Sequence, residues 1–222
     1  MLCGSLGSTA AMWDAQRPVL EGRRVVTIEH PGHGAAPLVD VAGIQALAAR
    51  VLEQVGGEQF SFVGLSLGGA IGMQLALDVP RQTDKLLLAC TSARFGDPQQ
   101  WLERAAVVRA RGLEAIVDAV LARWFTTPAD ERWREMFLSV DREGYARCCE
   151  GIAAWDAREA VPQITAPTLV VAAAQDPSTP PDQLFAIAEA IPGARLELIE
   201  RAAHLANIER ADEFNRLLED WL

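Results

Sequence analysis

The stretch from Phe60 to Ala70 constrains this chain more than any other. Its first half is an apolar run rich in Phe and Val, which is typical of a buried strand. The run breaks into Gly64-x-Ser66-x-Gly68, and an apolar helical pattern follows at once. Strand, G-x-S-x-G turn and helix in this order indicate a nucleophile elbow, because only glycines leave room for so tight a turn. Ser66 is therefore the candidate nucleophile, and the alternative is a glycine-rich turn with an incidental serine.

Charge and composition exclude several classes of protein. The 222 residues fit one domain, and the net charge of −10 argues against nucleic acid or an anionic membrane as partner. No apolar run is long enough to span a membrane, and the N-terminus lacks the basic and apolar regions of a signal peptide. The four cysteines, Cys3, Cys90, Cys148 and Cys149, show no C-x-x-C spacing. We therefore expect free thiols, no metal site and a cytoplasmic location.

Strand and helix patterns alternate along most of the chain. Strand patterns end at Cys3 and cover residues 24–28, 60–65, 85–90, 167–174 and 195–199. Helical patterns cover residues 13–20, 41–55, 181–191 and 211–222, and one runs from the elbow to near Pro80. This alternation predicts an α/β fold with a doubly wound, mostly parallel sheet, and a site outside the carboxyl ends of its strands.

The pattern changes between residues 91 and 163, where no strand is predicted. Four helices are expected there. The first begins at Asp97-Pro98 and ends at Gly112, and the second covers residues 113–125. The third begins at Thr127-Pro128, and the fourth begins at Asp141. We therefore predict a core of residues 1–91 and 164–222 and an inserted helical cap of residues 92–163.

Asp176 and His204 each follow a late predicted strand. Their loops should open on the same edge of the sheet as Ser66, so the three side chains can form a nucleophile, an orienting acid and a base. Alone, Asp176 is more simply a turn-forming Asp-Pro and His204 a surface-loop histidine. Their order in the chain, Ser then Asp then His, favours the triad.

Stabilising a tetrahedral oxyanion requires backbone N–H groups near the nucleophile. Those of Leu67, the residue after Ser66, and Leu6, in the loop after the first strand, are the candidates. The alternative is that residues 4–7 form a flexible terminus. His30 and His33 are rivals to His204 as the base, but their Pro-Gly-rich setting favours a structural turn.

Arg123 and Trp124 close the second helix of the predicted cap. An arginine at a helix C-terminus is most simply a solvated cation that complements the helix dipole. The alternative is a guanidinium that binds a substrate carboxylate beside an aromatic wall. Cys148 and Cys149 are expected to pack inside the cap.

These motifs together resemble the bacterial 3-oxoadipate enol-lactonases, a family of α/β-hydrolases. The likeness spans nearly the whole chain. It is carried by Ser5-Leu6-Gly7-Ser8, Met12-Trp13-Asp14, Pro31-Gly32-His33-Gly34, Gly64-Leu65-Ser66-Leu67-Gly68-Gly69, Arg123-Trp124-Phe125, Gly144-Tyr145-x-x-Cys148-Cys149, Pro167-Thr168-Leu169-Val170, Asp176-Pro177-x-Thr179-Pro180-Pro181 and Ala203-His204-Leu205-x-Asn207-Ile208-Glu209. Family members usually carry two more strands before the Ser5-Leu6-Gly7 loop, so the resemblance implies a sheet without these N-terminal strands.

The resemblance implies an enzyme of aromatic-compound catabolism that hydrolyses an anionic lactone to 3-oxoadipate without a cofactor. Ser66 would be the nucleophile, His204 the base and Asp176 its orienter, with Arg123 and Trp124 as contacts to the small-molecule substrate. A C–C hydrolase of ring-cleavage products and a generic carboxylesterase are the alternatives within enzymes. A ligand receptor on the same fold is the alternative outside them, and a homo-oligomer stays open.

Overall fold

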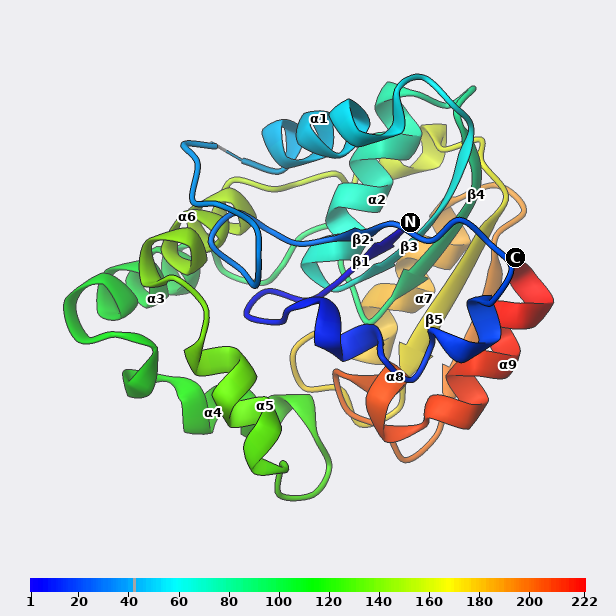
Figure 1. Cartoon of the computed structure of the whole chain (residues 1–222). Coiled ribbons are helices and arrows are strands. Elements are labelled where there is room, and N and C mark those ends of the chain that lie inside the picture. The colour runs from blue at the N-terminus through cyan, green and yellow to red at the C-terminus, as the bar shows by residue number, and fades with distance from the viewer. Residues whose placement is uncertain (42) are drawn as a thin grey trace.

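A six-stranded sheet forms the centre of the molecule in the computed structural model, which describes residues 1–41 and 43–222 (Figure 1). Its strands are β1 (Leu2–Cys3), β2 (Thr27–Ile28), β3 (Phe60–Leu65), β4 (Thr83–Ala89), β5 (Thr168–Ala173) and β6 (Arg195–Ile199). The spatial order is β2-β1-β3-β4-β5-β6, and every pairing is parallel. The predicted doubly wound α/β fold is confirmed.

Four helices are inserted between β4 and β5. They are α3 (Pro98–Arg111), α4 (Val117–Trp124), α5 (Glu131–Leu138) and α6 (Arg142–Ala153), called the insertion below. They lie together to one side of the sheet (Figure 1). The Asp97 side chain accepts a hydrogen bond from Gln99 N, and that of Asp141 accepts from Glu143 N and Gly144 N, so α3 and α6 begin at the predicted capping residues. The exact limits of a core and a cap domain stay a prediction.

Two helices of the insertion differ from the expected ones. The predicted helix of residues 113–125 is a short 3₁₀ turn, η3 (Leu113–Ala115), followed by α4, because Ile116 leaves helical geometry at φ −128° and ψ −10°. The third helix begins at Glu131, not at Pro128. Thr126 instead donates backbone and side-chain hydrogen bonds to Glu209 Oε1, both 2.7 Å long, which hold the preceding segment against the rest of the molecule.

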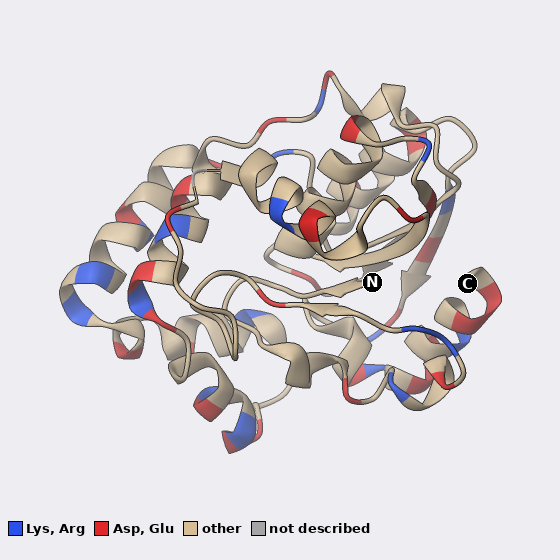
Figure 2. Ribbon diagram, turned by 45° about the horizontal axis from the view of Figure 1, so that its top comes forward, with Lys and Arg blue, Asp and Glu red and all other residues tan. Residues whose placement is uncertain are grey.

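Charged residues of both signs lie side by side on α3 and α6 (Figure 2). Arg109 on α3 pairs with Glu143 at 2.8 Å and with Glu150, both on α6. Arg147 on α6 pairs with Asp40 at 2.8 Å. Solvent screens these partly exposed pairs, so each adds little to stability.

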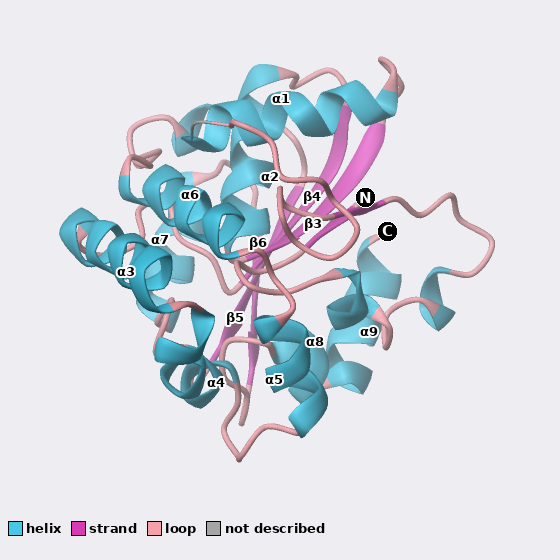
Figure 3. Cartoon of the chain, turned by 60° about the vertical axis from the view of Figure 1, so that its left-hand side comes forward, coloured by secondary structure: helices cyan, strands magenta, loops and turns pink. Residues whose placement is uncertain are grey.

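The remaining helices cover the two faces of the sheet. They are α1 (Gly43–Val55), α2 (Leu67–Asp78), α7 (Pro181–Ala190), α8 (Ala206–Glu209) and α9 (Ala211–Trp221), with 3₁₀ turns η1 (Ala10–Trp13), η2 (Pro18–Leu20) and η4 (Val161–Gln163). α1 and α2 lie on one side of the strands, and α8 and α9 on the other (Figure 3). Residues 67–76 of α2 are all buried, so this helix is part of the core.

Three N-terminal elements are shorter than the sequence indicates. The expected helix of residues 13–20 is replaced by η1 and η2, because Pro18 cannot continue a helix. The expected strand of residues 24–28 shrinks to Thr27–Ile28, since its neighbour β1 offers only Leu2 and Cys3 for pairing. The helix expected from residue 41 begins at Gly43, and position 42 lies outside the described residues.

The chain reverses its winding between β1 and β3. After β1 it moves outward to β2 and then returns to form β3 on the other side of β1. The loop after β1 and the turn after β3 therefore flank one crevice, and such switch points at carboxyl ends are where α/β sheets bind ligands. Ser66 lies in the turn after β3, between that strand and α2.

The first turn of α2 packs directly on the end of β1. A Cβ atom at Gly68 would lie 2.0 Å from Cys3 O, and one at Gly64 would lie 2.3 Å from Gly68 O. Gly68 N also donates a 3.0 Å hydrogen bond to Gly4 O. Both glycines are therefore required by backbone atoms that cannot move aside.

We expect Gly68→Ala to lower the free energy of unfolding by at least about 3 kcal/mol, because the added methyl group meets main-chain atoms. Gly193→Ala is the matched control, since Gly193 is exposed and nothing lies within 4 Å of its added Cβ. The left-handed φ of 75° at Gly193 should cost about 1 kcal/mol. Urea unfolding of both variants measures the difference, and equal losses would contradict the close-packing argument.

Candidate active site

Ser66 occupies a strained backbone conformation at the start of α2. Its φ of 59° and ψ of −114° lie where non-glycine residues are rarely found. Neighbouring elements hold it there: Ser66 N donates to Ala89 O at 3.0 Å, and Thr91 Oγ1 donates to Ser66 O at 2.7 Å. These bonds use the main chain of Ser66 and leave its hydroxyl free for chemistry.

Asp176 and His204 form a buried pair. His204 Nδ1 lies 2.8 Å from Asp176 Oδ2, and both residues are 3% exposed. Asp176 follows β5 and His204 follows β6, so the parallel sheet brings the two loops to one edge. The two side chains that were predicted to pair from their positions after successive strands are thus in direct contact.

The Asp176 carboxylate is surrounded by donors. Ser178 N and Thr179 N donate to Oδ1 at 2.7 and 3.1 Å, and Thr179 Oγ1 donates to Oδ2 at 2.6 Å. Burial alone would raise the pKa of Asp176, but the charge of His204 and the hydrogen bonds from His204 and Thr179 outweigh it and lower the pKa. Asp176 is therefore a carboxylate at neutral pH, and His204 Nδ1 carries the proton between the two side chains.

The other ring nitrogen of His204 is consequently the basic one in the neutral ring. Ser5 Oγ lies 3.5 Å from His204 Nε2. Ser66, His204 and Ser5 all line one small cavity of about 40 Å³. An unprotonated Nε2 in the same cavity as a candidate nucleophile is an arrangement suited to general-base chemistry.

The insertion forms the opposite wall of this cavity. That wall includes Trp101, Arg104, Val120, Arg123, Trp124 and Tyr145. Two of these residues are cations, and no Asp or Glu of the described residues is among the lining side chains. The cavity therefore favours an anionic ligand, although the whole chain carries a net charge of −10.

Arg123 and Trp124, the predicted substrate contacts, both line the cavity. Trp124 is 3% exposed and packs edge-on against Phe137, with the ring centroids 5.6 Å apart. Arg123 is exposed at the rim. Their role in binding substrate stays a prediction.

Leu6 and Leu67 flank the cavity from two sides. Leu6 belongs to the loop after β1 and lines the cavity, and Leu67 is the first residue of α2. Within residues 1–41 and 43–222, neither backbone N–H group is used in a hydrogen bond outside the helices and strands. The N–H of Leu67 also has no partner within its helix, since it belongs to the first turn. Both groups are therefore available to a developing oxyanion.

His30 and His33 support the loop that carries Leu6. His30 Nε2 donates to Gly4 O at 2.9 Å. His33 Nδ1 donates to Pro31 O at 3.0 Å, and Nε2 accepts from Gly7 N at 3.2 Å. Burial lowers the pKa of His30 to about 4 and that of His33 to about 3. Neither ring lines the cavity, which favours the structural role over that of a base.

The His204 loop is fastened to the insertion through main-chain and carboxylate contacts. His204 N and Leu205 N donate to Arg123 O and Trp124 O at 3.4 and 3.0 Å. Glu209 Oε2 accepts from Ala203 N at 2.7 Å, while its Oε1 accepts from Thr126. Glu209 thereby links the segment before His204 to the segment after α4.

Three residues at the site are revealed by the structure and not by the sequence. They are Thr179, Arg104 and Glu209, of which the first lies three residues after Asp176 and the last five after His204. Short spacing from a predicted site residue was the available signal for those two. Nothing in the sequence placed Arg104 in the cavity, because that depends on how α3 packs over the sheet edge.

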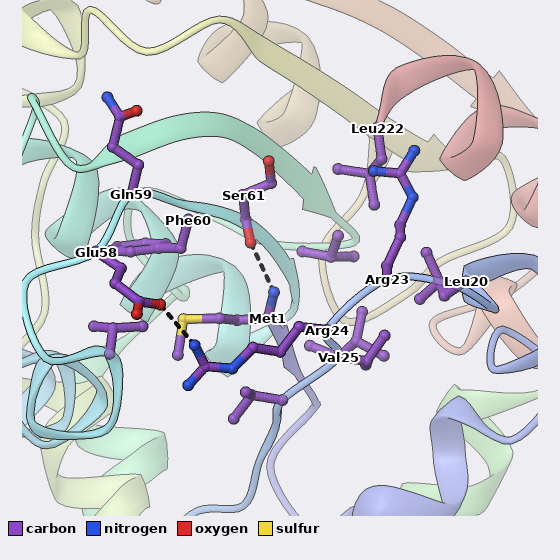
Figure 4. Close-up of a pocket in the computed structure, with 14 residues that line it drawn as sticks. Met1, Leu20, Arg23, Arg24, Val25, Glu58, Gln59, Phe60, Ser61 and Leu222 are labelled. Atoms are coloured by element: carbon purple, nitrogen blue, oxygen red, sulfur yellow. Dashed lines mark hydrogen bonds and ion pairs between the residues drawn. The ribbon is translucent and has the colours of Figure 1, made fainter.

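A larger hollow lies elsewhere, at the amino ends of β1 and β3 (Figure 4). Met1 N donates to Ser61 O there at 2.7 Å, and Arg24 pairs with Glu58 at 2.6 Å. Leu20, Val25 and Phe60 supply apolar walls. This hollow lies at the wrong end of the strands to reach Ser66, so the smaller cavity is the candidate active site.

In the part of the chain that the structure describes, no three His, Cys, Asp or Glu side chains could together hold a metal ion. The four cysteines are buried free thiols. No helix among residues 1–41 and 43–222 is long and apolar enough to cross a membrane.

The parallel sheet, the strained serine and the buried Asp–His pair define a hydrolase of the doubly wound α/β class. The chain belongs to the alpha/beta hydrolase family, whose model matches residues 2–217. It is 34% identical to 3-oxoadipate enol-lactonase 2 of Acinetobacter baylyi, over 97% of this chain and 85% of that protein. It is 31% identical to a putative carbamate hydrolase RutD of Agrobacterium fabrum, over 100% of this chain and 92% of that protein.

Solved structures agree with this assignment. The enol-lactonase from Burkholderia xenovorans LB400 has a TM-score of 0.94 and 37% identity, covering 99% of this chain and 89% of that one. A thermophilic esterase from Thermogutta terrifontis has a TM-score of 0.90 and 26% identity, covering 99% of this chain and 87% of that one. The predicted resemblance to the enol-lactonases is confirmed.

We expect His30 and His33 to stay neutral well below pH 6, and NMR can test this directly because the chain has only three histidines. The folded pKa values lie below the ordinary value of about 6.5, so the unfolded chain binds more protons in that window. The contribution of these two neutral histidines to the free energy of unfolding is therefore fully present above about pH 6.5 and is lost as the pH drops toward 4. Ring signals of both residues that shift between pH 8 and 6 would contradict this, with His33→Gln assigning the signals.

Glu209→Gln should lower the free energy of unfolding by about 1–3 kcal/mol, because an amide places a donor against one of the N–H groups the carboxylate now accepts from. The turnover of any hydrolysed ester should fall too, because Glu209 holds the backbone of Ala203, the residue next to the candidate base His204. Glu200→Gln removes the same charge at an exposed site and is the control. Thermal unfolding and ester hydrolysis of both variants measure the effect, and indistinguishable variants would exclude the linking role of Glu209.

Proposed function

We propose that this protein hydrolyses 3-oxoadipate enol-lactone to 3-oxoadipate, with Ser66, His204 and Asp176 as a catalytic triad. The observation that carries the proposal is a single cavity that holds Ser66 and His204 on one wall and two arginines on the other. Ser66 and His204 can open an acyl–oxygen bond, and the two arginines can hold the free carboxylate of the lactone.

In the first step Ser66 Oγ attacks the lactone carbonyl while His204 Nε2 takes its proton. General-base assistance of this kind is typically worth about 10²–10⁴ in rate. Asp176, ionised and hydrogen-bonded to Nδ1, keeps the ring in the required tautomer and stabilises the imidazolium. The N–H groups of Leu6 and Leu67 stabilise the tetrahedral oxyanion, and losing one such donor typically costs about 10²–10³.

Collapse of this intermediate breaks the ring C–O bond and expels an enolate, a better leaving group than an alkoxide. The proton on His204 satisfies the enol oxygen, and the product remains tethered because the substrate is cyclic. Water then attacks the acyl-enzyme and gives a proton to His204, which passes it to Ser66 Oγ as the acyl–Ser66 bond breaks and the second carboxylate is released. The enol of the product tautomerises to the 3-oxo form. These reaction steps need no redox cofactor, because the substrate is neither oxidised nor reduced.

The choice of substrate is supported by likeness and by charge. Two relatives named as enol-lactonases align over 97–99% of this chain at 34% and 37% identity. Arg123 and Trp124 at the cavity give a cation beside an aromatic wall. Carbamate hydrolysis is the second candidate, supported by the 31% identity to the RutD protein, and it would use the same nucleophile.

Loss of lactone absorbance on addition of the purified protein tests the proposal. Ser66→Ala should reduce kcat by at least about 10⁴-fold, because the acyl-enzyme cannot form. Ser61→Ala, which removes a hydroxyl from β3 outside the cavity, is the control and should retain full activity.

Three other outcomes would each change the assignment. Cleavage of simple aryl esters without cleavage of the lactone would keep the triad and reject the substrate. Lactone turnover that persists in Ser66→Ala would reject the mechanism. Failure of a fluorophosphonate probe to label Ser66, with neither substrate cleaved, would favour a ligand receptor on this fold.

A further inference from the structure

Arg104 on α3 lines the same cavity as Ser66 and His204 and is held there by an aromatic platform. Its guanidinium carbon lies 4.5 Å from the centroid of the Trp101 ring. Trp101 Nε1 donates a 2.7 Å hydrogen bond to Phe95 O, and the Phe95 and Trp101 rings meet edge-on at 6.4 Å. The ring is thus fixed on two sides, and stacking on it restricts the guanidinium before any ligand arrives.

Arg104 is partly buried without a carboxylate to balance its charge. In residues 1–41 and 43–222 it forms no ion pair, whereas Arg109 on the same helix pairs with Glu143 and Glu150. Arg147 on α6 likewise pairs with Asp40 and Glu143. The chain has ten more acidic than basic side chains, yet no carboxylate of the described residues pairs with Arg104. Its guanidinium is therefore free to bind a ligand.

A hydroxyl group lies beside this cation. Tyr145 on α6 is 1% exposed and also lines the cavity. Burial raises the pKa of its phenol, and the nearby Arg104 charge partly opposes that rise. A neutral phenol O–H and a guanidinium therefore converge on one part of the cavity wall, which supplies the donors a carboxylate requires.

We propose that Arg104, with the Tyr145 hydroxyl beside it, binds the free carboxylate of an ester or lactone whose acyl carbon is attacked by Ser66. Arg123, exposed at the rim, then attracts the anion, while the stacked and partly buried Arg104 fixes its position. This assigns specificity for substrates with a carboxylate on the part remote from the reacting bond. It rests on the hydrolysis proposed above.

Two aryl esters with the same leaving group test this assignment. Monophenyl adipate carries a free carboxylate, and phenyl hexanoate has an acyl chain of equal length without one. Arg104→Gln should lower kcat/KM for monophenyl adipate by between about 10- and 100-fold, mostly through KM, and should change that for phenyl hexanoate less than 3-fold. Arg111→Gln, at an exposed position on the same helix, should leave both unchanged.

Equal losses on both esters, or no loss on the charged one, would overturn the assignment. Tyr145→Phe gives a milder loss confined to the charged ester, and it serves as the second variant if Arg104→Gln does not fold. Calorimetric titration of Ser66→Ala with adipate separates binding from chemistry. Adipate binding that weakens at least 10-fold when Arg104→Gln is added supports the site even if neither ester is cleaved, and binding that does not depend on Arg104 refutes it.

Discussion

The contact between the end of β1 and the first turn of α2 is the constraint on which the site depends. Gly68 approaches Cys3 and Gly4 so closely that no side chain fits, and its N–H bonds to Gly4 O. This contact fixes the loop after β1 against the helix that begins beside Ser66. It thereby sets the N–H of Leu6 and that of Leu67 on either side of one crevice. Two backbone segments from separate strands become one rigid surface without any side chain between them.

Around that surface the buried acid is ionised while the buried histidines are neutral. The hydrogen-bond partners of each group account for the difference. Asp176 is buried but accepts bonds from Ser178, Thr179 and His204, so it stays ionised. His30 and His33 are buried among carbonyl and amide groups without a carboxylate partner, so they stay neutral. A neutral ring suits this position, because His33 must accept a hydrogen bond from Gly7 N at one nitrogen while it donates to Pro31 O from the other.

The insertion is part of the site as well as its cover. The last carbonyl groups of α4 accept from the backbone of His204 and Leu205, and Glu209 binds Thr126 from the opposite side. Movement of α4 would therefore disturb the ring that serves as base in the proposed mechanism. The same helices bring Arg104 and Arg123 to the cavity, so a strongly acidic chain presents a locally cationic pocket.

The sequence by itself determined the features that depend on local pattern. The elbow at Ser66, the caps at Asp97 and Asp141 and the strand of residues 195–199 all lie where periodicity and turn chemistry indicate. Parallel strands share one carboxyl edge, so the meeting of Asp176 and His204 could also be predicted, while the catalytic roles remain proposals. Tertiary structure decided the rest: the break at Ile116, the late start of α5, the support that Thr179 gives to Asp176, and the place of Arg104 in the cavity wall. Each of these depends on contacts between segments or on side-chain packing. Such contacts produce no periodic pattern in the sequence, because they are set by how the helices and loops pack over the sheet.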